Sequence, residues 1–111
     1  MGASKLQRPA QAFELHVFLG TATAKEAAGL EWMPGVQYPL LILVRQPEGE
    51  MPDEALARRS ASAAGWTAIK LERSKRLPAT AAPEGEALRD AFREALIQGS
   101  AVVAYGKPLG K

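Results

Sequence analysis

The stretch FELHVFL, residues 13–19, alternates between apolar and mixed side chains, and the stretch TAIKLE, residues 67–72, does the same. Side chains alternate across a β-strand, so each stretch places one apolar face against a core and a mixed face outward. The outward faces are expected to carry Glu14, His16, Phe18, Lys70 and Glu72. The alternation predicts a sheet that helices cover on one side only, with the other side free for contact.

A continuous apolar run, LLILV at residues 40–44, lies between Pro39 and Pro47. A run of this length with prolines on both sides is typical of a strand buried on both faces. It is the best candidate for the centre of the sheet. Ile42 and Leu43 are therefore both expected to be buried.

The remaining pattern predicts strands at about 12–19, 66–73 and 100–105, a short helix at 21–29, and longer helices at 53–64 and 84–98. Asp53 is a good residue to begin a helix, and Gly65 is a good residue to end one. Strand–helix–strand units favour parallel pairing with right-handed crossovers. The expected fold is an α/β, α+β-like two-layer sandwich, with a four-stranded mixed or mostly parallel sheet and two main helices on one face; the strand order stays open. We expect a single domain over residues 1–111, with a loose tail at about 1–11.

The composition excludes several classes of site. The 111 residues include no cysteine, so disulfides, thiolate catalysis and zinc–thiolate sites are excluded. No apolar run approaches the roughly 20 residues of a membrane span. There is no apolar leader typical of secretion, and a reducing cytoplasm is the expected location. No cofactor is expected.

His16 is the single histidine, and Glu14 lies on the same face of its strand. This pair could form a general base oriented by a carboxylate, or half of a metal site. A small-ligand or enzyme site centred on Glu14 and His16 is thus the second hypothesis for function. The sequence offers neither a second histidine nor clustered carboxylates, so we assign no catalytic residue and no metal ligand. If His16 is an ordinary strand residue without such a role, His16→Ala should leave the fold intact.

A basic cluster follows in the third strand and could contact phosphates. Its members are Lys70, Arg73, Lys75 and Arg76. Glu72 interrupts the cluster, and Trp66 is the one aromatic side chain near enough to stack on a base. The net charge of +2 is also small for a nucleic-acid-binding protein. Nucleic-acid contact is accordingly the third hypothesis.

The first hypothesis is a non-catalytic interaction module that uses the open sheet face. Apolar side chains of the central run would join Phe18 there, inside a rim of Glu14, His16, Lys70 and Glu72. Such a patch is typical of an interface. A homodimer is the simplest partner, with an unidentified second protein as the alternative, and Phe18→Glu would produce a monomer.

Overall fold

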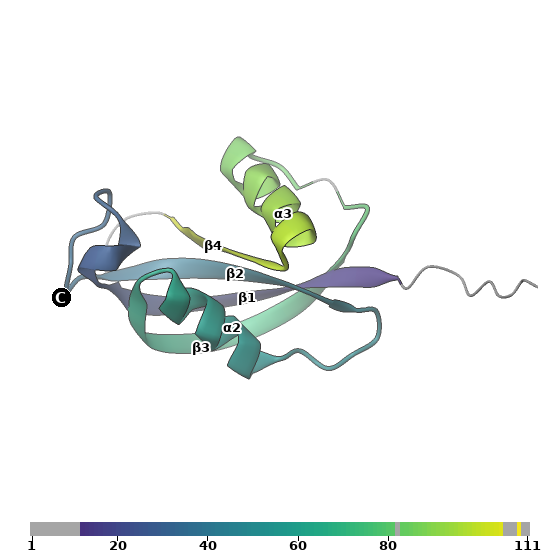
Figure 1. The fold of residues 1–111 in the computed structure, drawn as a ribbon, viewed down its shortest axis with the longest axis horizontal. Helices are drawn as coiled ribbons and strands as arrows, with labels where there is room; N and C mark the ends of the chain where they lie inside the picture. The colour runs from purple at the N-terminus through teal and green to yellow at the C-terminus, as the bar shows by residue number, and fades with distance from the viewer. Residues whose placement is uncertain (1–11, 82, 106–108, 110–111) are drawn as a thin grey trace, which may run out of the picture.

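The computed structural model describes residues 12–81, 83–105 and 109 (Figure 1). Along the chain, the elements are β1 (Phe13–Ala24), η1 (Glu26–Ala28), β2 (Gln37–Pro47), α2 (Glu54–Ala63), β3 (Trp66–Pro78), α3 (Glu86–Gln98) and β4 (Ser100–Ala104). The tail expected at residues 1–11 lies outside the described residues. Asp53 begins α2 as expected, because its side chain accepts a hydrogen bond of 3.0 Å from the Leu56 amide.

The four strands form one sheet in the order β3–β1–β2–β4, and every neighbouring pair is antiparallel. The expectation of a mixed or mostly parallel sheet is therefore wrong. Parallel neighbours need a crossover connection, whereas the helix expected at 21–29 is one 3-10 turn, and Thr21–Ala24 continue β1. The chain turns back after η1, so β2 pairs with β1 in the opposite direction. Helix α2 does connect two parallel strands, β2 and β3, but β1 lies between them.

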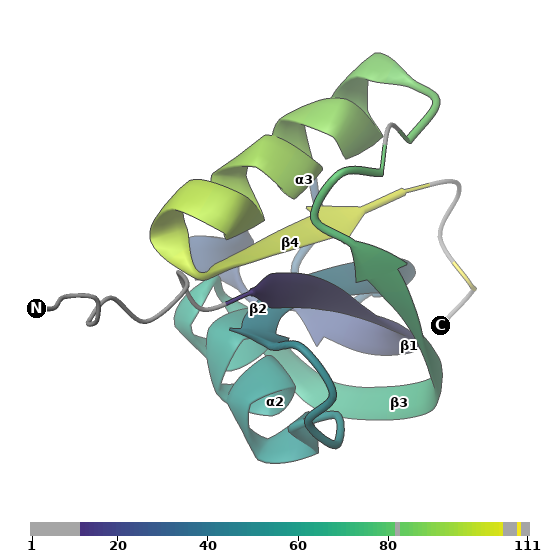
Figure 2. The ribbon, with the colours of Figure 1, turned by 90° about the vertical axis from the view of Figure 1, so that its right-hand side faces the viewer.

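The two helices lie on opposite faces of the sheet, as the end-on view shows (Figure 2). Helix α2 packs on the face that carries Phe18 and Ile42, and helix α3 packs on the face that carries Leu15 and Leu43. The expectation of two helices on one face is also wrong. The central run is nevertheless buried on both sides as predicted, except at Leu41, because each helix covers one of its faces; Ile42 and Leu43 have no exposed surface.

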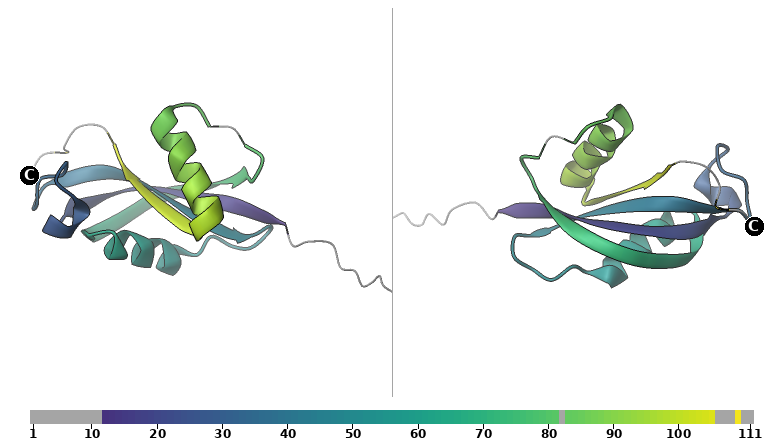
Figure 3. Two further views of the ribbon diagram at one scale, coloured as in Figure 1. Left: turned by 45° about the horizontal axis from the view of Figure 1, so that its top comes forward. Right: turned by 180° about the vertical axis from the view of Figure 1, so that it is seen from behind.

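Strand β3 forms one edge of the sheet, clearly visible from behind (Figure 3, right), and its pairing with β1 is irregular. Leu19 lies opposite Arg73 while the next residue, Gly20, lies opposite Leu71, so Glu72 is an extra residue in β3. Such a bulge changes which side chains of a strand face each side of the sheet. Beyond it, Leu71 packs with the α2-side core, whereas Arg73 remains opposite Leu19 on the other face.

Candidate functional site

His16 is buried at the end of the α2-side core, with none of its surface exposed. Its Nε2 lies 2.8 Å from Oε2 of Glu14, two residues before it on β1. Its Nδ1 lies 2.8 Å from Oε1 of Gln46, on the neighbouring strand β2. Both ring nitrogens are therefore used inside the protein.

The Gln46 amide is oriented by the loop that leads into α2. Its Oε1 also accepts a 2.9 Å hydrogen bond from the Asp53 amide, and its Nε2 donates over 2.9 Å to the Met51 carbonyl. Oxygen atoms thus face both nitrogens of His16, so the ring is held from two sides. The histidine fastens the loop 48–53 to the sheet. No catalytic role is supported, because both nitrogens of His16 are already bonded inside the protein.

One carboxylate oxygen of Glu14 has two hydrogen-bond partners and one ion-pair partner. Besides His16, the Gly49 amide donates over 3.0 Å, and Nε of Arg76 lies 3.6 Å away on β3. The hydrogen bond from His16 is the main cause that lowers the pKa of Glu14 below its ordinary value of 4.5, and the Gly49 amide adds to it. The charges of His16 and Arg76 act in the same direction, while partial burial acts against them.

Acid should therefore weaken the fold through Glu14. A carboxylate whose pKa is lowered by folding stabilises the native state above its unfolded pKa, and this contribution is lost as the pH falls through the folded pKa. We expect the difference in melting temperature between the unmodified chain and Glu14→Gln to be largest at about pH 7 and to shrink towards about pH 3. Thermal unfolding followed by circular dichroism at several pH values checks this. A difference that stays constant with pH would contradict it.

The interaction face expected from the alternation is placed differently by the structure. Phe18 is 1% exposed and packs under α2 with Ala57 and Ala61, and Glu14 is 8% exposed. With His16, these two side chains belong to the covered face and cannot form an outer contact surface. The face assignment was inverted because alternation shows that a strand has two faces, but not which of them a helix covers. Phe18→Glu would therefore disturb the core instead of testing an interface. Lys70 and Glu72 are exposed on β3.

The basic cluster of β3 is split between the two faces of the sheet. Arg76 lies opposite His16, and its guanidinium bonds the Glu50 carbonyl over 2.8 Å. By their register the other three cations lie on the α3 side, where Lys70, Arg73 and Lys75 lie opposite Thr21, Leu19 and Val17. Arg73, next to the bulge, also borders a small hollow beside Phe18 and Glu54. The tryptophan considered for base stacking is 4% exposed and packs against Trp32 and Tyr38. The nucleic-acid hypothesis needs the four cations and an exposed aromatic side chain on one surface. The described residues do not provide such a surface.

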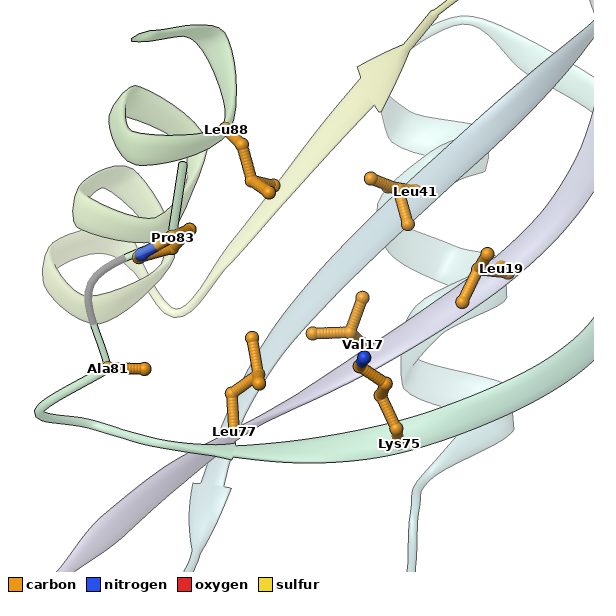
Figure 4. Close-up of a pocket in the computed structure, with 8 residues that line it drawn as sticks. All are labelled: Val17, Leu19, Leu41, Lys75, Leu77, Ala81, Pro83 and Leu88. Atoms are coloured by element: carbon orange, nitrogen blue, oxygen red, sulfur yellow. The ribbon is translucent and has the colours of Figure 1, made fainter. Parts of the chain in front are cut away.

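An apolar groove lies on the α3 side of the sheet and was missed by the sequence analysis (Figure 4). Helix α3 crosses above β4 and β2, which leaves the β1–β3 half of this face without a helix (Figure 3, left). The floor of the groove consists of Val17, Leu19, Leu41 and Leu77. Its wall consists of Ala81, Pro83 and Leu88. We call this site, with a volume of about 420 Å³, the α3-side groove.

One charged side chain, Lys75, reaches into the α3-side groove from β3 (Figure 4). Arg73 and Lys70 follow it along the same face of the strand. Within the described residues, none of these three cations forms an ion pair. The groove therefore combines an apolar floor with a row of one sign of charge along one side.

The described part of the chain has no cluster of three histidine or carboxylate side chains that could hold a metal ion, and no helix with the length and apolar character needed to cross a membrane. Comparisons with models of protein families, with curated proteins and with solved structures found no match to this chain. The α3-side groove is therefore identified as the candidate site from the structure of this chain alone.

Proposed function

We propose that the chain is a non-catalytic binding module whose ligand surface is the α3-side groove. The observation that carries this proposal is the β1–β3 half of the sheet face beside α3, where Leu19 and Leu77 stay partly exposed together with Leu41 of the neighbouring strand β2. Apolar surface of this kind is stabilised when a ligand or partner removes it from water, by about 25 cal/mol for each Å² buried. A cytoplasmic location is part of the proposal and is consistent with the lack of cysteine.

The size and lining of the groove suit binding. Its volume of about 420 Å³ lies in the range of ligand pockets, which are mostly apolar with a few polar groups that fix orientation. Lys75 is the polar group here, and its charge favours a ligand that is both apolar and anionic. The binding role expected from the sequence is thereby kept, but it moves to the opposite face of the sheet.

Self-association through the groove is a weaker form of the same proposal. A symmetric dimer uses the same surface twice, so the row of Lys70, Arg73 and Lys75 would lie near its own copy. Like charges at an interface oppose association. The oligomeric state therefore serves as an outcome of the tests below.

Anilinonaphthalene sulfonate, a fluorescent dye with an apolar body and one negative charge, is a suitable first probe. We expect the folded chain to bind it saturably, and Leu19→Glu or Leu88→Glu to weaken binding by about tenfold or more, because each places an anion in the apolar lining. Fluorescence titration measures this. The two variants alter different elements, a strand and a helix, so a shared loss locates the dye between them.

The matched control is Ile97→Glu, which adds the same charge to an exposed apolar residue of α3 outside the groove lining. It should leave the titration unchanged. Circular dichroism must show native helix content for all variants, since partly unfolded chains also bind this dye. Dye binding that is absent, or equal in Leu19→Glu and the control, would overturn the assignment of the groove.

A further inference from the structure

We propose that the occupant of the α3-side groove is an acidic amphipathic helix of a partner protein, packed on the sheet beside α3. This inference rests on the proposed function, because it names the partner of the same surface. It uses three features of the described residues: the width of the uncovered sheet, the position of its apolar side chains, and the single sign of its charges.

The uncovered half of the sheet has the width of one helix. It consists of β3 and of β1, of which α3 covers only the part around Leu15 and Val17, beside β2 and β4, which α3 contacts more extensively. Neighbouring strands lie about 4.8 Å apart, so two strands present a band about 10 Å wide. An α-helix with its side chains has a diameter of about 10 Å, and packed helices lie about 8–10 Å apart. A second helix beside α3 would therefore complete this layer.

The apolar side chains lie where such a helix would rest. Val17 and Leu19 follow one another on the same face of β1, and Leu77 lies beside them on β3. Leu88 extends the apolar surface onto α3, so the occupant would contact the sheet below it and the helix at its side. A helix with an apolar stripe along one face is the usual occupant of a groove of this shape.

The charges select an acidic partner. Lys75 lines the outer side of the groove. Arg73 and Lys70 lie opposite Leu19 and Thr21 further along the same strand, and the described residues form no ion pair with any of the three cations. The opposite wall presents Ala81, Pro83 and Leu88, which carry no charge. A bound helix would therefore place acidic side chains towards β3 and an apolar stripe towards the floor and α3.

The two terminal segments of this sequence do not suit the groove. The segments at residues 1–11 and 106–111 contain basic residues but no acidic residue, so their charge does not complement the row on β3. A second copy would bring an identical basic row to the contact, as argued above. Charge complementarity thus assigns the occupant to a different protein.

The test uses synthetic helical peptides of about 18 residues, long enough to form a helix in isolation. One carries leucines at positions i, i+3, i+4 and i+7 with glutamates beside them. A second has lysine in place of every glutamate, and a third keeps the glutamates but has glutamine in place of every leucine. Each carries a fluorophore for titration by anisotropy. We expect the first peptide to bind about tenfold tighter than either of the others. The expected difference from the lysine peptide is no larger than this because exposed ion pairs each contribute little free energy.

A charge swap provides the decisive control. The triple variant Lys70→Glu, Arg73→Glu, Lys75→Glu should prefer the lysine peptide. A matched triple variant, Lys25→Glu, Arg59→Glu, Arg89→Glu, makes the same change in net charge at exposed positions outside the groove and should still prefer the acidic peptide. Native circular dichroism is required of both.

The outcomes separate this inference from the proposed function. If the dye binds in the groove but the acidic leucine peptide does not, the helix is wrong and the binding module stands. If neither binds, both are wrong. Equal binding of the two glutamate peptides would show attraction by charge alone and overturn the helix. A dimer in light scattering that Leu19→Glu dissociates would assign the groove to a second copy, and would overturn it as well.

Discussion

His16→Ala is expected to destabilise the fold by about 3 kcal/mol, because it removes buried volume and takes one hydrogen-bond donor from each of two buried polar side chains. The imidazole is fully buried, and its nitrogens bond Glu14 and Gln46. This reverses the expectation from the sequence that the substitution leaves the fold intact. For a domain of this size the melting temperature should fall by more than about 10 °C. Thermal and urea unfolding measure the change.

His16→Phe separates the two contributions. Phenylalanine restores an apolar ring of similar shape but cannot donate a hydrogen bond, so about 1–3 kcal/mol of the loss should remain. Hydrogen exchange gives a local measurement, because the amides of Gly49 and Asp53 bond the same two side chains and should exchange faster. A His16→Phe variant as stable as the unmodified chain would show that the hydrogen bonds do not stabilise the fold.

Gly20→Ala is expected to be at least as damaging, at about 3 kcal/mol or more, because the added methyl group has no room. A Cβ atom at this position would overlap the backbone carbonyl oxygen of Lys70 and lie 3.1 Å from Cα of Leu71. Both obstacles are backbone atoms of the neighbouring strand, so no change of rotamer relieves them. Strand β3 would have to move away from β1 at the bulge, and the outer side of the groove would move with it.

Gly35→Ala is the control for this substitution. A Cβ atom there meets nothing within 4 Å, although φ is +84°, so the cost should be about 1–2 kcal/mol from the left-handed backbone alone. Urea unfolding of both variants should show the larger loss for Gly20→Ala, together with a loss of dye binding. Equal stability of the two variants would contradict the close approach of the strands.

Local patterns in the sequence predicted those parts of the fold that local physics decides. The apolar run at 40–44 indicated the central strand, and Asp53 indicated the start of α2. In these cases the information lies within a few residues. The bounds of β3 were less accurate, because the strand was expected to end at about residue 73 and continues to Pro78.

Topology and the site depended on contacts between distant residues. Alternation along β1 could not reveal that α2 covers Phe18, because neither the sequence of β1 nor that of α2 shows which face of the sheet the helix packs on. The partner of His16 is Gln46, thirty residues away, so a short-range pairing with Glu14 was all that the sequence offered. The bulge at Glu72 has no recognisable sequence pattern, yet it decides which cations of β3 face the groove. Four apolar residues of the groove are close together in the sequence, but only the fold brings them next to β1 and β2. They are Leu77, Ala81, Pro83 and Leu88.

The long edge strand β3 also has a consequence for the behaviour of the protein in concentrated solution. An edge of thirteen residues offers backbone groups to which strands of other molecules can add, the first step towards aggregates. Bulges and lysine or arginine side chains make such an edge a poor template, and β3 has both. The cations beside the groove would then keep separate molecules apart as well as attract a ligand. Neutral residues at Lys70, Arg73 and Lys75 would remove both effects, whereas glutamates would reverse the charge and still protect the edge.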